Sequence, residues 1–65
     1  MEQIIIVPDM RCNHCVARIT AALNEISADF TVDLSTKTVT VRGEERAITA
    51  AFNEIYDLGF TPERK

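Results

Sequence analysis

The sequence has no tryptophan, one histidine, two glycines, two prolines and no long apolar run. Its strongest apolar run, residues 4–7, is far shorter than the roughly 20 residues that cross a membrane, and it is too short for a secretory signal. Ten acidic residues outnumber seven basic ones, giving a net charge of −3 without the basic cluster that nucleic acid requires. We therefore expect a cytoplasmic protein that neither inserts into a membrane nor binds nucleic acid.

The residue content also gives little support for an enzymatic function. The single histidine gives no basis for hydrolysis, and the two glycines lie too far apart for a phosphate-binding loop, so we expect no enzymatic activity. What the 65 residues do have is a hydrophobic share of 46%, enough for one compact core. The length predicts a single domain over residues 1–65. Its stability should be modest, because so small a domain buries only about 60% of its unfolded surface.

The first half of the chain predicts a strand, a loop and a helix. Residues 4–7 form a β-branched run that ends at Pro8, which cannot donate to a strand ladder. Beyond a loop over residues 8–14, apolar residues recur at spacings of three and four, which predicts a helix over residues 16–26. Asn13 is the expected N-cap, because its side chain can accept a hydrogen bond from an early helix N–H.

The second half predicts a hairpin, a helix and a short strand. Apolar and polar residues alternate over residues 30–34 and 38–42, and the segment between them is short enough for a hairpin. A second helix is expected to start near the acidic pair 44–45, whose charge suits a helix N-terminus, and to end at Gly59. A last, short strand is expected to begin at Phe60.

The resulting order, βαββαβ, predicts an α+β ferredoxin-like sandwich, a four-stranded antiparallel sheet with two helices on one face. In the first strand, Ile5 and Val7 are expected to face the helices, which leaves Ile4 and Ile6 on the open face. There they are either ordinary surface residues or a patch for a partner. The expected core consists of Ile5, Val7, Ile19, Leu23, Ile26, Val32, Leu34, Val39, Val41, Ile48, Phe52 and Ile55.

Cys12 and Cys15 carry the chemistry that this scaffold would present. Thiolates are soft ligands that select Cu(I), Zn(II), Hg(II) and similar ions over hard ones. Two sulfurs are enough for Cu(I), whereas Zn(II) prefers four ligands in a tetrahedron. His14 could be a third ligand or a solvated loop residue, and Asp9 could add a carboxylate for Zn(II). The ligand count favours the low-coordinate ion, Cu(I).

The place of the pair, at the start of the first helix, also affects its chemistry. Unpaired N–H groups and the helix dipole lower the pKa of a thiol at such a place, and Cys15 is expected to gain most of this effect. Cys12, in the loop, is expected to be the more exposed sulfur. Arg11 and Arg18 can add positive potential. The pair should therefore bind a metal ion at neutral pH and release it again.

The motif Met10-Arg11-Cys12-Asn13-His14-Cys15 resembles the MxCxxC of the heavy-metal-associated domain family. The hairpin over residues 32–41 and the segment Leu58-Gly59-Phe60 are similar to the same family, so the resemblance covers nearly the whole chain. The family comprises small copper chaperones and the N-terminal domains of copper-transporting P-type ATPases. The resemblance implies Cu(I) on Cys12 and Cys15, and direct transfer in the cytosol to a like CxxC domain, such as that of a copper-transporting ATPase.

The resemblance also assigns places to single residues. It implies that Met10 turns into the core and supports the loop rather than binding metal, and that Phe60 lies near the metal loop as apolar cover. The sequence departs from the family pattern at Asp9, where glycine is usual, and at Arg11, where threonine is commonest. Residues 27–29 lack the usual Gly-Val before the second strand.

Alternative functions stay open on the residues alone. Zn(II), Cd(II) or Hg(II) could replace Cu(I), in a metal transporter or a resistance system, and the ion could be shared in a thiol-bridged homodimer. A thiol–disulfide redox protein would use the same CxxC, but the chain is short for a thioredoxin fold and has no tryptophan beside the motif. An RNA-recognition module shares the element order, yet the expected strand over residues 38–42 has no aromatic residue to stack on bases.

Overall fold

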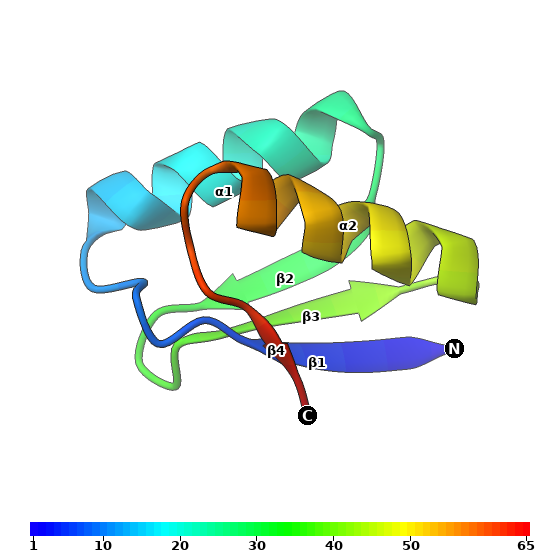
Figure 1. Cartoon of the computed structure of the whole chain (residues 1–65), viewed down its shortest axis with the longest axis horizontal. Coiled ribbons are helices and arrows are strands. Elements are labelled where there is room, and N and C mark those ends of the chain that lie inside the picture. Colours follow the sequence, from blue (N-terminus) through cyan, green and yellow to red (C-terminus); the bar gives the residue numbers. More distant parts are fainter.

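The computed structural model describes all residues, 1–65, and contains six elements. In chain order they are β1 (Glu2–Ile6), α1 (Asn13–Glu25), β2 (Asp29–Asp33), β3 (Thr38–Arg42), α2 (Glu45–Asp57) and β4 (Glu63–Arg64). The strands form one antiparallel sheet in the order β2-β3-β1-β4, and Figure 1 shows both helices over the same face of it. The predicted ferredoxin-like βαββαβ fold is confirmed. Neither helix has the length and apolar character of a membrane span.

The register of the sheet explains which side chains face the helices. β1 lies between β3 and β4, and Ile5 of β1 is opposite Val39 of β3. Both side chains are fully buried. Ile4 and Ile6, one residue away on either side, are half-buried opposite threonines of β3. The alternation along the first strand is therefore as predicted, with the open face on the side of Ile4 and Ile6.

The core matches the expected set with one exception. Eight of the twelve expected residues are fully buried, and Val32, Leu34 and Phe52 are partly buried against them. Ile26 was predicted to be buried, and this is wrong, since the side chain is 37% exposed. α1 ends at Glu25, so the helical spacing that placed Ile26 on the buried stripe does not continue to that residue.

Several predicted boundaries are also wrong. β1 covers residues 2–6 rather than 4–7, and β2 covers residues 29–33 rather than 30–34. α1 begins at Asn13 rather than at Val16, and its N-cap is Cys12, whose backbone is extended, rather than Asn13. Apolar spacing could not detect this first turn because most of its side chains are polar. The last strand forms at Glu63–Arg64 instead of at Phe60, which is buried and follows the turn after α2.

The turn that follows α1 places Ser27 in the left-handed region, with φ of +56°. Its N–H bonds the carbonyl of Asn24, and the N–H of Ala28 bonds that of Leu23, which closes the helix C-terminus. At this φ, a residue with a Cβ atom is strained by about 1–2 kcal/mol, and replacing it with glycine relieves this strain. Glycine loses more backbone entropy on folding, which offsets about half of the relief. We expect Ser27→Gly to raise the free energy of unfolding by about 0.5–1 kcal/mol in urea titrations. Ser27→Ala keeps the strain and should bring no such gain; lower stability in Ser27→Gly would contradict this account.

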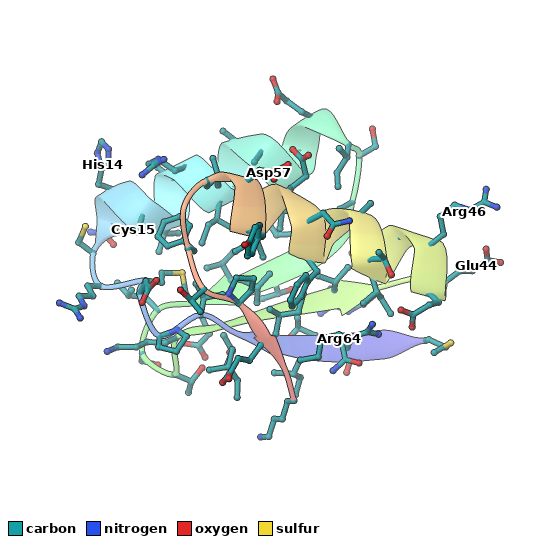
Figure 2. All side chains as sticks on the ribbon, in the orientation of Figure 1. His14, Cys15, Glu44, Arg46, Asp57 and Arg64 are labelled. Atoms are coloured by element: carbon teal, nitrogen blue, oxygen red, sulfur yellow. The ribbon has the colours of Figure 1, made fainter.

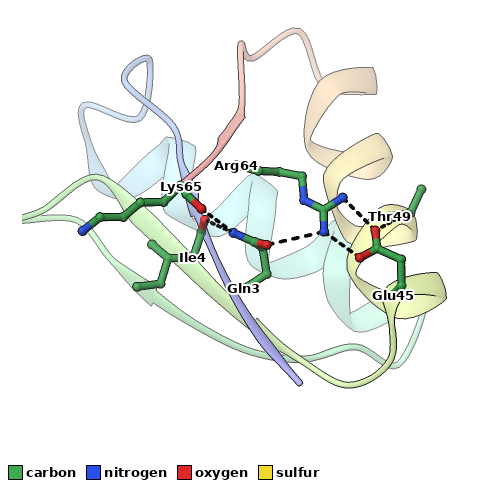
Figure 3. A network of polar contacts seen from close by, with 6 residues as sticks. All are labelled: Gln3, Ile4, Glu45, Thr49, Arg64 and Lys65. Carbon is green, nitrogen blue, oxygen red and sulfur yellow. Dashed lines mark hydrogen bonds and ion pairs between the residues drawn. The ribbon is translucent and has the colours of Figure 1, made fainter.

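A polar network fastens the C-terminal strand to α2 and β1 (Figure 3). The guanidinium group of Arg64 donates to both carboxylate oxygens of Glu45, at 2.7 and 2.8 Å. The side-chain amide of Gln3 donates to the carbonyls of Ile4 and Lys65, each at 3.0 Å. Because β4 has only two residues, these side-chain contacts supplement a very short strand ladder.

The ion pair in this network predicts a pH-dependent stability. Arg64 lowers the pKa of Glu45, and a hydrogen bond from Thr49 acts in the same direction. A carboxyl group with a depressed folded pKa stabilises the fold above its unfolded pKa of about 4.3, and this contribution is lost as pH falls through the folded value. We expect Glu45→Gln to lower stability modestly at pH 7 and to have no effect at about pH 2, in paired urea titrations. Both partners are exposed, so added salt should shrink the effect. An equal loss at both pH values would contradict the ion pair as its cause.

Candidate metal centre

Cys12 and Cys15 lie at the corner where the loop after β1 enters α1. Cys12 is the N-cap and Cys15 belongs to the first turn, so one helical turn brings the two side chains together. Their sulfurs are 3.7 Å apart, and both thiols are free. Cys12 is exposed, as predicted, whereas Cys15 is half-buried against the hydrophobic core. The pair can therefore be reached from solvent on the Cys12 side.

The sulfur separation sets the bite that the pair offers to an ion. With the zinc–sulfur bond length of about 2.3 Å, the 3.7 Å separation gives an S–Zn–S angle of about 107°. A linear complex needs the sulfurs at twice the bond length, about 4.6 Å. The pair is thus about 0.9 Å (4.6 minus 3.7) too close for linear coordination. As it stands, it suits a bent arrangement with room for another ligand.

Cys12 is the N-cap of α1, whereas the sequence placed it in the loop before the helix. The pKa of Cys12 lies below its ordinary value, mainly because the backbone N–H of Cys15 faces its sulfur. The Cys15 thiol and the backbone N–H of His14 lower it further. These groups favour the charged form at a distance, since no close side-chain hydrogen bond caps α1. These contacts therefore stabilise the thiolate of the exposed sulfur.

The structure gathers no third metal-ligating side chain at the pair. No group of three or more His, Cys, Asp or Glu residues is placed to hold one ion. Asp9 is engaged elsewhere, because its Oδ2 accepts the backbone N–H of Thr61 at 3.1 Å. His14 is exposed and projects outward from the first turn of α1 (Figure 2). At this corner the structure therefore gathers two sulfurs and no further ligating side chain.

The pair borders the hydrophobic core through Cys15. Met10 is fully buried, and Phe60 is 8% exposed in the same core cluster, against which Cys15 packs. Met10 is turned into the core, as the sequence resemblance implies. Arg18 donates from Nη2 to the carbonyl of Leu58 at 3.1 Å, and its guanidinium carbon is 5.6 Å from the centroid of the Phe60 ring.

Sequence reasoning missed two of these contacts. It placed Arg18 near the pair but not on Leu58 and Phe60, and it considered Asp9 only as a ligand. The contacting residues are 40 and 52 positions apart, and no spacing rule connects residues so distant in the chain. The only hint in the sequence was that residue 9 is aspartate, where the family usually has glycine.

The chain has relatives among known domains and structures. It matches the sequence model of the Heavy-metal-associated domain over residues 4–57. No curated protein matches it. It is similar to the heavy metal binding protein TM0320 from Thermotoga maritima, with 30% identity and a TM-score of 0.86, over 97% of this chain and 92% of that one.

Two further structures carry copper-related descriptions. A CopZ metallochaperone is 25% identical, with a TM-score of 0.80, over 97% of this chain and 100% of that one. A copper chaperone from Synechocystis PCC6803, solved in its Cu2 form, is 31% identical, with a TM-score of 0.64, over 92% of this chain and 97% of that one. The fold and the paired thiols define a small heavy-metal-binding domain. The chain belongs to the heavy-metal-associated domain family, whose model covers most of its length.

Proposed function

We propose that residues 1–65 form one module that binds a single Cu(I) ion through the thiolates of Cys12 and Cys15 and passes it to a partner protein. The observation that carries the proposal is the pair itself. Two free thiols lie 3.7 Å apart at a helix N-terminus, one of them exposed, and no third ligand is gathered with them. Soft thiolates select a soft ion, and so small a ligand set suits one of low coordination number. The similarity to a metallochaperone supports the same function.

An incomplete ligand set favours transfer over storage. A storage site would surround the ion with buried ligands, whereas here the bent pair leaves one side of the ion open. A thiolate from a partner can then bind before either original metal–sulfur bond breaks, so that the ion never passes free through water. The exposed Cys12 marks the side from which the partner approaches.

The expected partner is another CxxC domain, such as that of a copper-transporting P-type ATPase. A homodimer of this chain around one shared ion is a variant of the same exchange. The exposed Arg11 adds positive potential beside the pair on a chain of net charge −3, and this charge can steer the encounter with an acidic surface. On this proposal the protein works in the cytoplasm, inserts into no membrane and has no catalytic role.

Transfer is tested by mixing the Cu(I)-loaded protein with an apo CxxC domain in the presence of a chelator that captures free Cu(I). Direct exchange should deliver metal to the domain faster than spontaneous dissociation delivers it to the chelator. The matched control is the same acceptor domain with both of its cysteines replaced by serine. If the chelator intercepts all the metal for every CxxC partner tried, a buffering role replaces the handover.

The bite of about 107° also favours a tetrahedral ion, which keeps Zn(II), Cd(II) and Hg(II) as the second candidates. The number of ligands argues against these ions, since the chain supplies only two of the four ligands that Zn(II) prefers. A redox function would instead close the pair into a disulfide. Anaerobic competition titrations with Cu(I) and Zn(II) against calibrated chelators separate the metals, and a higher affinity for Zn(II) would reverse the assignment.

His14 should be dispensable for Cu(I) binding. The side chain is exposed and points outward, and the two sulfurs already satisfy a low-coordinate ion (Figure 2). We expect His14→Ala to keep close to wild-type Cu(I) affinity between about pH 6 and pH 8, where histidine titrates. Chelator competition across this range measures it. A large loss that grows with pH would make His14 a third ligand.

A further inference from the structure

The segment that leaves α2, residues 58–62, is held against the metal loop at two points. We propose that Asp9 and Arg18 form a clasp on this segment, and that the clasp limits access to Cys15 by holding Phe60 in place. Asp9 and Arg18 are then positioning residues for the thiol pair. The effect of the clasp on access to Cys15 does not depend on the proposed function. Its effect on metal release rests on that function.

The first point of the clasp is the carboxylate of Asp9, in the metal loop. Its Oδ2 accepts the backbone N–H of Thr61 at 3.1 Å. No backbone carbonyl accepts this N–H, so Asp9 supplies its one protein partner. The residues on either side of Thr61, Phe60 and Pro62, are both buried. Asp9 therefore ties the loop that carries Cys12 to the middle of the segment.

The second point is the guanidinium group of Arg18, on α1. Its Nη2 donates to the carbonyl of Leu58, the C-cap of α2, where the helix leaves carbonyls without intrahelical partners. The same guanidinium lies 5.6 Å from the centroid of the Phe60 ring, within the range of a cation–π contact. Gly59, between Leu58 and Phe60, has φ of +100°, which lets the chain reverse there. Arg18 therefore contacts the residue before this chain reversal, Leu58, and the residue after it, Phe60.

Cys15 is connected to the clasped segment through Arg18 and through the core cluster. Arg18 is three residues after Cys15, so both side chains lie on the same side of α1. Cys15 also packs against the core cluster that contains Phe60. Releasing either point would let the segment move and would expose Cys15, whereas Cys12 is exposed already. The clasp therefore affects one sulfur of the pair and not the other.

The test uses the full chain, reduced and free of metal. Iodoacetamide alkylation is followed separately at Cys12 and Cys15 by peptide mass spectrometry, and amide hydrogen exchange is followed at Thr61 by NMR. In Asp9→Ala we expect alkylation of Cys15 and exchange at Thr61 to rise about three- to tenfold, the factor that corresponds to the net loss of one ordinary, solvent-exposed hydrogen bond. Arg18→Ala should raise alkylation of Cys15 similarly. The rate at Cys12 should stay unchanged.

Two matched variants exclude other causes. Asp9→Asn removes the charge but keeps an acceptor oxygen, so it should stay close to wild type. Asp29→Ala removes a carboxylate that pairs with Arg42 on the open face of the sheet, far from the clasp in the fold, and should also change nothing at Cys15. Unchanged rates at Cys15 in both Asp9→Ala and Arg18→Ala would overturn the proposal. An equal rise at Cys12 and Cys15 would also overturn it, because it indicates an effect of charge or of general loosening.

The same variants, loaded with Cu(I), are then mixed with a chelator. Release from Asp9→Ala should be faster than from wild type by a similar factor, at an unchanged stoichiometry of one ion per chain. If Asp9→Ala releases Cu(I) as slowly as wild type, access to Cys15 does not control metal release. If the wild-type chain binds no Cu(I), the proposed function fails, while the alkylation rates still decide whether the clasp exists.

Discussion

Replacing either Cys12 or Cys15 with serine is expected to lower Cu(I) affinity by orders of magnitude. The sulfurs are 3.7 Å apart, and no other ligating side chain is gathered with them, so the loss of one leaves a single protein ligand. A serine hydroxyl is a hard donor that does not replace a soft thiolate. The effect should exceed the roughly 10- to 100-fold that changes in the groups supporting a ligand cost. Anaerobic competition against a calibrated Cu(I) chelator measures it.

Stability should change little in the Cys12→Ser variant, because that side chain is exposed. A urea titration of each apo variant therefore separates loss of the ligand from loss of the fold. His14→Ala serves as the matched control, since it alters a residue between the two cysteines without removing a sulfur. Near-wild-type affinity in either serine variant would remove the assignment of the pair as the metal site.

Replacing Met10 with alanine is expected to remove much of the stability of the domain. Met10 is fully buried in the hydrophobic core, and truncating a buried methionine costs about 2–5 kcal/mol. At about 0.05–0.15 kcal/mol per residue, a chain of 65 residues has only about 3–10 kcal/mol in total. Urea titration of the apo protein measures the loss. A change of less than about 1 kcal/mol would mean that the core does not depend on this side chain.

Met10→Leu separates the packing role from a ligand role. Leucine has a similar volume and no sulfur, so stability should fall by less than about 1.5 kcal/mol. Because the side chain lies in the core and not at the pair, Cu(I) affinity should stay close to that of wild type. If Met10→Leu keeps the fold but loses Cu(I) affinity strongly, the thioether is a ligand and the two-sulfur site is incomplete.

The exposed Ile26 shows where sequence patterns stop being informative. The same apolar spacing that correctly placed Ile19 and Leu23 in the core also selected Ile26, but the helix ends one residue earlier. The backbone then enters the left-handed turn at Ser27, which no apolar pattern signals. The N-cap was misplaced for a related reason. Capping depends on the φ and ψ angles of one residue, and Asn13 and Cys12 both precede the same apolar stripe.

The sequence by itself determined the element order, the buried faces and the pair of thiols. Each of these depends on residues close together in the chain: alternation along a strand, spacing along a helix, and two cysteines within one helical turn. The tertiary structure decided what surrounds the pair. Asp9 and Arg18 find their partners 52 and 40 residues away, after the sheet has brought the two loops to the same end of the molecule. It also decided that Cys12 is the N-cap of α1, because the start of a helix is fixed by backbone geometry and packing rather than by the spacing of cysteines.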